Sequence, residues 1–192
     1  SAYSLTYEHN TPFSHKRAQG ELDPICEETD RAMYELTIDL LQKAGFVHYE
    51  ISNFARPGCE CEHNLIYWNN LPYIGIGPAA GSWWQGRRKT NCPSVSDYLH
   101  AVQNLQLPPC ETETPDPIQI ACETAVLNLR KISGINLPQF KLQTGYDALQ
   151  LFAAPIAKFQ QSQLLALRND HLALTPQALP IADTVLCEFS SL

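Results

Sequence analysis

The stretch GFVHYEISN, residues 45–53, decides how the first half of this 192-residue chain is interpreted. Apolar and polar residues alternate along it, with Val47, Tyr49 and Ile51 on one face, as in a half-buried strand. Upstream, apolar residues recur at helical spacing over 25–44, and residues 2–8 alternate again. Because two strands joined by a helix must run parallel, the pattern predicts a right-handed βαβ unit within an α/β fold.

The polar faces of these two strands carry Thr6, Glu8, Glu50 and Ser52. In a barrel with its helices outside, these faces point to the lumen, and polar residues there indicate a ligand. The alternative is a half-exposed sheet with one face in water. A third strand is predicted at 73–77, where two glycines on one face leave room for close approach to the backbone.

Composition excludes some classes of function. The net charge is −7, with 13 Lys and Arg against 20 Asp and Glu, so a non-specific polyanion or membrane-surface binder is not expected. No apolar run approaches the roughly 20 residues of a membrane span, and no signal peptide is visible. The seven cysteines are odd in number and scattered, which favours a cytoplasmic protein over a secreted disulfide framework.

A proline-rich stretch at 108–117 predicts a boundary between two domains, residues 1–110 and 111–192. A helix is predicted before it, over 94–105. After it, the pattern predicts helices, a hairpin over 164–174 and a final helix, an order similar to a winged-helix module. From residue 115 onward there are five basic and six acidic residues, so we expect no nucleic-acid partner.

The segment from Cys59 to Trp68 contains the candidate chemistry. Cys59, Cys61 and His63 alternate and offer thiolates and an imidazole, although a zinc site normally has four ligands and favours CxxC spacing. His63 is the better candidate as a single ligand. Tyr67 and Trp68 offer flat, apolar side chains that would pack against a large aromatic molecule such as a porphyrin. The alternative is a loop packed by its own aromatic residues. The run GIGPAAG at 75–81 lacks a dinucleotide fingerprint.

Three motifs together resemble the oxygen-independent coproporphyrinogen III oxidase-like radical SAM family. They are YEISNFARPG at 49–58, HNLIYW at 63–68 and GIGPAAGS at 75–82. The HNLIYW stretch resembles the heme-chaperone branch of that family. The resemblance implies the C-terminal part of a partial TIM-type barrel, with parallel strands and helices outside, followed by a small, mainly helical, winged-helix-like domain.

The resemblance also implies the function and the site. We expect a heme-binding protein that delivers heme to an unidentified acceptor protein; the alternative is the oxidative decarboxylation of coproporphyrinogen III to protoporphyrinogen IX. His63, Tyr67 and Trp68 are the expected heme-binding residues. Thr6 and Gly81 resemble positions that approach S-adenosylmethionine (SAM).

The family's cluster-binding CxxxCxxC motif is missing from these 192 residues. We therefore interpret the chain as a C-terminal fragment, expect SAM and a [4Fe–4S] cluster only in a full-length protein, and expect no catalytic or metal-binding residues here. Because an open barrel leaves strand edges unpaired, self-association is a further expectation.

Overall fold

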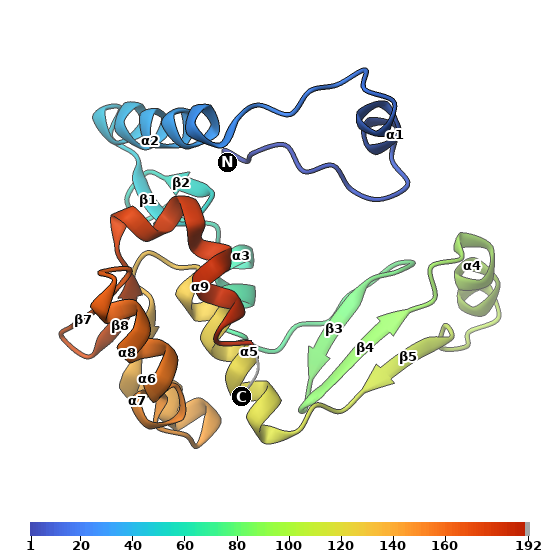
Figure 1. Ribbon diagram of the computed structural model, residues 1–192. Helices are drawn as coiled ribbons and strands as arrows, with labels where there is room; N and C mark the ends of the chain where they lie inside the picture. The colour runs from blue at the N-terminus through green and yellow to red at the C-terminus, as the bar shows by residue number, and fades with distance from the viewer. Residues whose placement is uncertain (191–192) are drawn as a thin grey trace. The chain divides into compact units, whose positions relative to one another are not determined.

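Residues Ser1–Glu60 form the first of two structural units in the computed structural model, which describes residues 1–190. Helices α1 (Pro12–Ala18) and α2 (Glu27–Lys43) precede a hairpin of strands β1 (Val47–Glu50) and β2 (Asn53–Ala55) (Figure 1). α2 confirms the helix predicted over 25–44. α1 was not predicted, although Thr11 and Ser14 form a capping box that marks its start.

The strand predicted at 2–8 is wrong, and the strand predicted at 47–53 is confirmed only over its first part, as β1. Residues 2–8 form no strand, and Tyr3 and Leu5 remain 69% and 61% exposed. Residues 47–53 instead turn back on themselves, so that β1 pairs antiparallel with β2. The Glu50 carboxylate accepts the N–H of Ser52 at 2.9 Å and so stabilises the turn. Apolar and polar residues do alternate in both segments, but this pattern does not show where a strand ends or which strand it pairs with.

Polar side chains are buried at the turn of this hairpin. Glu50 is fully buried and accepts hydrogen bonds from Ser52 and Asn53. His48 is also buried; its Nε2 lies 3.0 Å from the carbonyl of Ile51, and its ring stacks on Phe54. Burial holds the pKa of His48 below its usual 6.5. The polar face therefore lies inside the unit at Glu50, whereas Thr6 and Glu8 are exposed.

Acid is expected to destabilise this first unit through His48. With its pKa lowered in the folded state, the unfolded chain binds the extra proton first, so stability is lost as pH falls below about 6.5. Thermal unfolding at pH 7.5 and pH 5 measures this loss, which His48→Gln should reduce. An equal acid-induced loss in the wild type and the variant would contradict this role of His48.

The second unit, Cys61–Leu192, begins with α3 (Glu62–Trp68) and a three-stranded antiparallel sheet. Its strands are β3 (Gly81–Trp84), β4 (Arg87–Asn91) and β5 (Cys110–Glu113), and α4 (Val95–Gln103) connects the last two. α4 confirms the helix predicted over 94–105. The third strand predicted at 73–77 is wrong, because only Tyr73 forms a bridge, to Trp83. Gly75 serves close packing, since a Cβ on it would lie 2.1 Å from the carbonyl oxygen of Gly81, whereas a Cβ on Gly77, which has a φ of +119°, would meet nothing within 4 Å.

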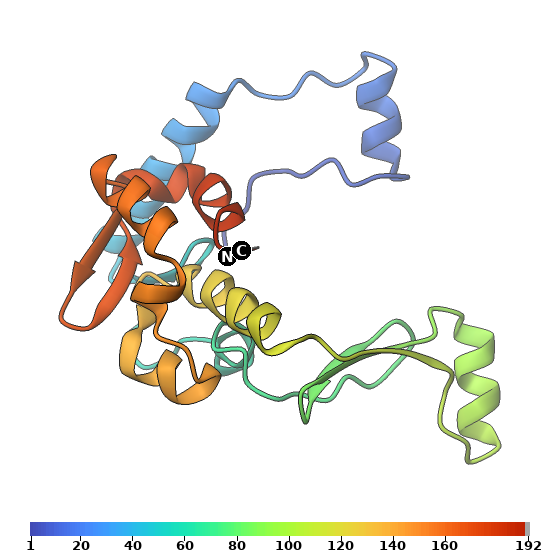
Figure 2. The same cartoon turned by 60° about the horizontal axis from the view of Figure 1, so that its bottom comes forward.

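A helical module, residues 117–190, follows β5 and contains most of the buried apolar side chains. Its elements are α5 (Pro117–Leu129), β6 (Ile135–Asn136), α6 (Leu137–Thr144), α7 (Ala148–Leu151), α8 (Ala153–Gln161), β7 (Leu165–Arg168), β8 (His171–Leu174), the 3₁₀ helix η1 (Pro176–Ile181) and α9 (Ala182–Cys187). Asp116 caps α5 through the N–H groups of Ile118 and Gln119. The hairpin β7–β8 is the one predicted over 164–174 and extends from the helices in Figure 2.

Two short helices, α7 and α8, precede the hairpin. α7 and α8 meet at Phe152, and Pro155 lies in the first turn of α8, where its missing N–H is not needed. The predicted final helix begins as the 3₁₀ helix η1.

All strand pairs within residues 1–190 are antiparallel, so the parallel sheet predicted for 2–8, 47–53 and 73–77 is wrong. Over the same residues, no helix is long and apolar enough to span a bilayer. The domain division at 110 and 111 stays a prediction.

Candidate functional site on helix α3

α3 brings His63 and Tyr67 together, because residues four positions apart share one face of a helix. They stand one turn apart, and the Tyr67 hydroxyl is hydrogen-bonded to His63 Nε2 at 3.0 Å. The two rings meet edge to face with centroids 4.8 Å apart. His63 is exposed and Tyr67 half-buried, so the imidazole stands at the protein surface against an aromatic ring.

Tyr73, which the sequence did not single out, extends this aromatic face. Its ring meets that of Tyr67 at a centroid distance of 4.6 Å, again edge to face. Burial raises the pKa of the Tyr73 hydroxyl, and the nearby Tyr67 hydroxyl raises it further by a smaller amount. We call His63, Tyr67 and Tyr73 the aromatic face of α3.

Trp68 does not belong to this aromatic face. The Arg130 guanidinium, at the end of α5, lies 4.6 Å from the centroid of the Trp68 ring in a cation–π contact. Asn128 of α5 also donates to the Trp68 carbonyl at 3.0 Å. The α5 region therefore determines where the indole packs, and the expected heme-binding role of Trp68 stays a prediction.

The end of α3 is bound to the helical module by a polar network that sequence reasoning missed. Its members, beside Asn128, are Asn69 and Asn70 after α3, Thr124 and Lys131 of the α5 region, and Gln143 of α6. No local sequence signal marks them, since each of these contacts between the end of α3 and the helical module joins residues more than 50 positions apart.

Lys131 is the unusual member of the network. It is only 9% exposed, and its ammonium group donates to the side-chain oxygens of Asn69 and Asn128. Within the part of the chain that the structure describes, no carboxylate forms an ion pair with it. Burial lowers the pKa of Lys131 to about 8.

The two residues expected near SAM lie in different units. Thr6 is exposed in an irregular segment, and Gly81 begins β3. The glycine stretch before β3 uses its backbone groups internally: Gly77 donates to the Tyr98 hydroxyl at 3.0 Å, and its carbonyl accepts from Asn91 at 2.9 Å. The SAM assignment of Thr6 and Gly81 stays a prediction.

The described residues, 1–190, contain no group of three His, Cys, Asp or Glu side chains that could hold a metal ion. The expectation that Cys59, Cys61 and His63 form no zinc site stays a prediction. Cys61 precedes α3 without a side-chain capping bond.

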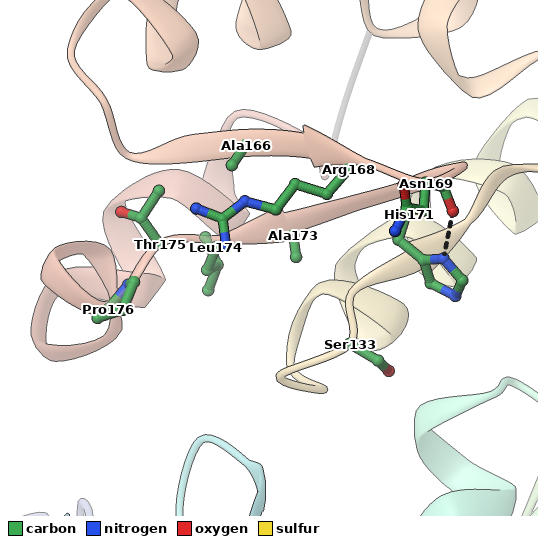
Figure 3. Close-up of a pocket in the computed structure, with 9 residues that line it drawn as sticks. All are labelled: Ser133, Ala166, Arg168, Asn169, His171, Ala173, Leu174, Thr175 and Pro176. Carbon is green, nitrogen blue, oxygen red and sulfur yellow. Dashed lines mark hydrogen bonds between the residues drawn. The ribbon is translucent and has the colours of Figure 1, made fainter.

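A hollow of about 460 Å³ lies elsewhere in the second unit, on the hairpin β7–β8 (Figure 3). Its apolar lining includes Ala166 and Ala173, which face each other across the two strands. Arg168 and His171 stand near the turn, and His171 Nδ1 is bonded to the Asn169 carbonyl at 3.0 Å. None of the predicted heme or SAM residues lines this hollow.

Sequence comparison relates nearly the whole chain to proteins named heme chaperone HemW. The identity is 32% to the protein of Lactococcus lactis and 30% to that of Bacillus subtilis, over 97% and 98% of this chain. These alignments cover 49% and 50% of the two relatives, so the chain spans about half the length of the curated relatives it matches. Residues 116–181 match the HemN C-terminal domain.

The fold is similar to that of a solved radical SAM enzyme, coproporphyrinogen III oxidase (HemN) from Escherichia coli. The TM-score is 0.66 over 91% of this chain and 44% of HemN, at 13% identity. This similarity confirms the expected fold class, the α/β C-terminal part of the HemN fold, although the individual strands differ from those predicted. Together, these matches relate the chain to the HemN-like radical SAM family and, within it, to the heme-chaperone branch.

Proposed function

We propose that this chain binds heme on the aromatic face of α3, with His63 as the iron ligand, and that a longer protein containing it delivers heme to an acceptor protein. The observation that carries the proposal is the exposed imidazole of His63, backed by the rings of Tyr67 and Tyr73. The relatives named heme chaperones, which align with nearly all of this chain, support it.

The residues on this face suit heme as a cargo. Imidazole is an established axial ligand of heme iron, and the two phenol rings supply apolar surface for a porphyrin. Ligation through Nε2 requires the Tyr67 hydroxyl to give up its hydrogen bond, which constrains the ring until heme arrives. Trp68, whose indole packs against Arg130, remains part of the proposed heme site on the same helix.

The remaining expectations are part of the same proposal. SAM and a [4Fe–4S] cluster belong to the longer protein, as the radical SAM relatives suggest, and the location is cytoplasmic, which seven cysteines without disulfides support. Self-association is supported by Met33, Leu36 and Leu40, which lie on α2 and are each more than half exposed. Porphyrinogen oxidation is not proposed, because the likeness to HemN at 13% identity concerns the fold alone.

Replacing His63 with alanine is expected to weaken hemin binding by the 192-residue chain at least about tenfold, equivalent to about 1.4 kcal/mol, because an iron–nitrogen bond is lost. Hemin titration followed at the Soret band measures the dissociation constant, and circular dichroism verifies that the fold is retained. Tyr67→Phe, which keeps the ring and releases Nε2, should bind hemin at least as tightly as the wild type.

His100→Ala is the matched control, because His100 is also exposed and lies on α4, outside the aromatic face. It should retain the wild-type affinity and Soret maximum. Equal affinity and equal spectra for the wild type, His63→Ala and His100→Ala would show that His63 is not the ligand.

A further inference from the structure

Hydrogen bonds from the helical module hold the end of α3. At the start, Cys61 provides no side-chain cap for the free N–H groups. At the end, the Trp68 carbonyl accepts from Asn128, and the backbone carbonyls of Asn69 and Asn70 accept from Gln143 at 3.0 and 3.1 Å. The helix is therefore anchored to the helical module through its last turn.

A second layer of contacts runs between side chains. Asn70 donates to the Thr124 hydroxyl at 2.9 Å, and Lys131 donates to Asn69. Lys131 also lies 3.4 Å from the side-chain oxygen of Asn128, the residue that holds the Trp68 carbonyl. Lys131 thus links the two asparagines that fix the end of α3.

Stability alone is a poor reason for a lysine at this position. A buried ammonium group without a carboxylate partner loses its hydration, and a well-packed apolar residue often replaces a buried charge without loss. Lys131 instead fixes the orientation of the segment after α3 relative to α5, because its ammonium group donates to the side-chain oxygens of both Asn69 and Asn128.

Because α3 is short, its first turn moves together with its last turn as one rigid unit. Its seven residues span about 10 Å and are joined by backbone bonds such as Leu65 N–H to the Cys61 carbonyl at 3.0 Å. A rotation at Asn69 therefore turns His63 with it, and also turns Tyr67 relative to Tyr73.

We propose that Lys131 is a positioning residue for heme binding, which orients His63 by fixing the far end of α3 to α5. The inference rests on the proposed function, since it assigns to the helical module the task of presenting the aromatic face. Lys131 itself does not touch the heme.

Lys131→Met tests this role, with Lys141→Met as the matched control. Lys141 lies in the same module, but on the surface, in an exposed ion pair with Asp147. Amide hydrogen exchange of residues 62–71, measured without heme, reports the anchoring of α3 directly. Hemin titration and urea unfolding of the same variants complete the set.

Lys131→Met is expected to accelerate exchange at Leu65, Asn69 and Leu71 at least about tenfold, and to weaken hemin binding several-fold with a shifted Soret maximum. The urea midpoint should remain near that of the wild type, because relief of the buried charge offsets the lost hydrogen bonds. Lys141→Met should change none of these quantities.

The readouts separate the two proposals. Wild-type exchange in Lys131→Met overturns the positioning role, whatever happens to hemin. Faster exchange with unchanged hemin affinity also overturns it, provided that His63→Ala does weaken hemin binding. If exchange is faster in Lys131→Met, but hemin affinity is unchanged in both Lys131→Met and His63→Ala, the proposed heme site fails. The anchoring of α3 by Lys131 is then still supported.

Discussion

Gly134→Ala is expected to destabilise the helical module by about 3–5 kcal/mol, at the upper end of single substitutions. Gly134 lies between α5 and β6 and has a φ of +71°, which an L residue adopts only at a cost of about 1–2 kcal/mol. A Cβ would also lie 2.1 Å from the carbonyl oxygen of Leu172 and 2.6 Å from the Cα of Ala173. Both obstacles are backbone atoms of β8, so relief requires the strand to move.

Gly145→Ala separates strain from steric overlap. Gly145 ends α6 with a similar φ of +81°, but a Cβ there would meet nothing within 4 Å. Its loss should be about 1 kcal/mol. Urea unfolding followed by circular dichroism measures both variants, and equal losses would show that the contact with β8 is not close.

Phe152→Ala is expected to destabilise the module by about 3–5 kcal/mol, because it removes a large buried side chain and leaves a cavity in the core. Phe152 is fully buried where α7 meets α8. Its ring lies 5.0 Å from that of Phe189 and 6.3 Å from that of Phe140, measured between centroids.

Leu142→Ala is the control for this cavity, since Leu142 is 89% exposed on neighbouring α6. Its change in unfolding free energy should lie within about 0.5 kcal/mol of zero. A loss below about 1 kcal/mol for Phe152→Ala would mean that the three rings do not form the centre of the core.

The helical module could be predicted well because its signals are local. Asp116 and Pro117 mark the start of α5, and the helical spacing of Ala121, Ala125 and Leu129 identifies three side chains that are fully buried. Asn169 and Asp170 supply the positive φ values of the turn between β7 and β8.

The strands of the first half could not be predicted, because pairing is not local. Tyr3 and Leu5 alternate like strand residues, yet within residues 1–190 no strand pairs with them. At 47–53 the alternation is equally regular, but the buried carboxylate of Glu50 stabilises a turn in the middle of the predicted strand. Periodicity indicates which residues share a face and leaves the neighbouring strand undetermined.

The candidate site was predicted in part for the same reason. The four-residue spacing of His63 and Tyr67 on a helix is local, and their contact follows from it. Trp68 and Lys131 are placed by contacts between α3 and the α5 region, more than 60 positions apart in the sequence. A lysine in an amphipathic pattern resembles a surface residue, so its burial had no signal in the sequence.

The most direct test of the account is whether a histidine nitrogen of this chain coordinates the heme iron. Pulsed electron paramagnetic resonance of the ferric heme complex, prepared with ¹⁵N-labelled histidine, detects such a nitrogen through the hyperfine coupling of the ¹⁵N nucleus to the unpaired electron spin of the iron. We predict the ¹⁵N coupling in the wild type and in His100→Gln, and its loss in His63→Gln. A coupling that persists in His63→Gln, or is missing from the wild type, would contradict the assignment of His63 as the heme ligand.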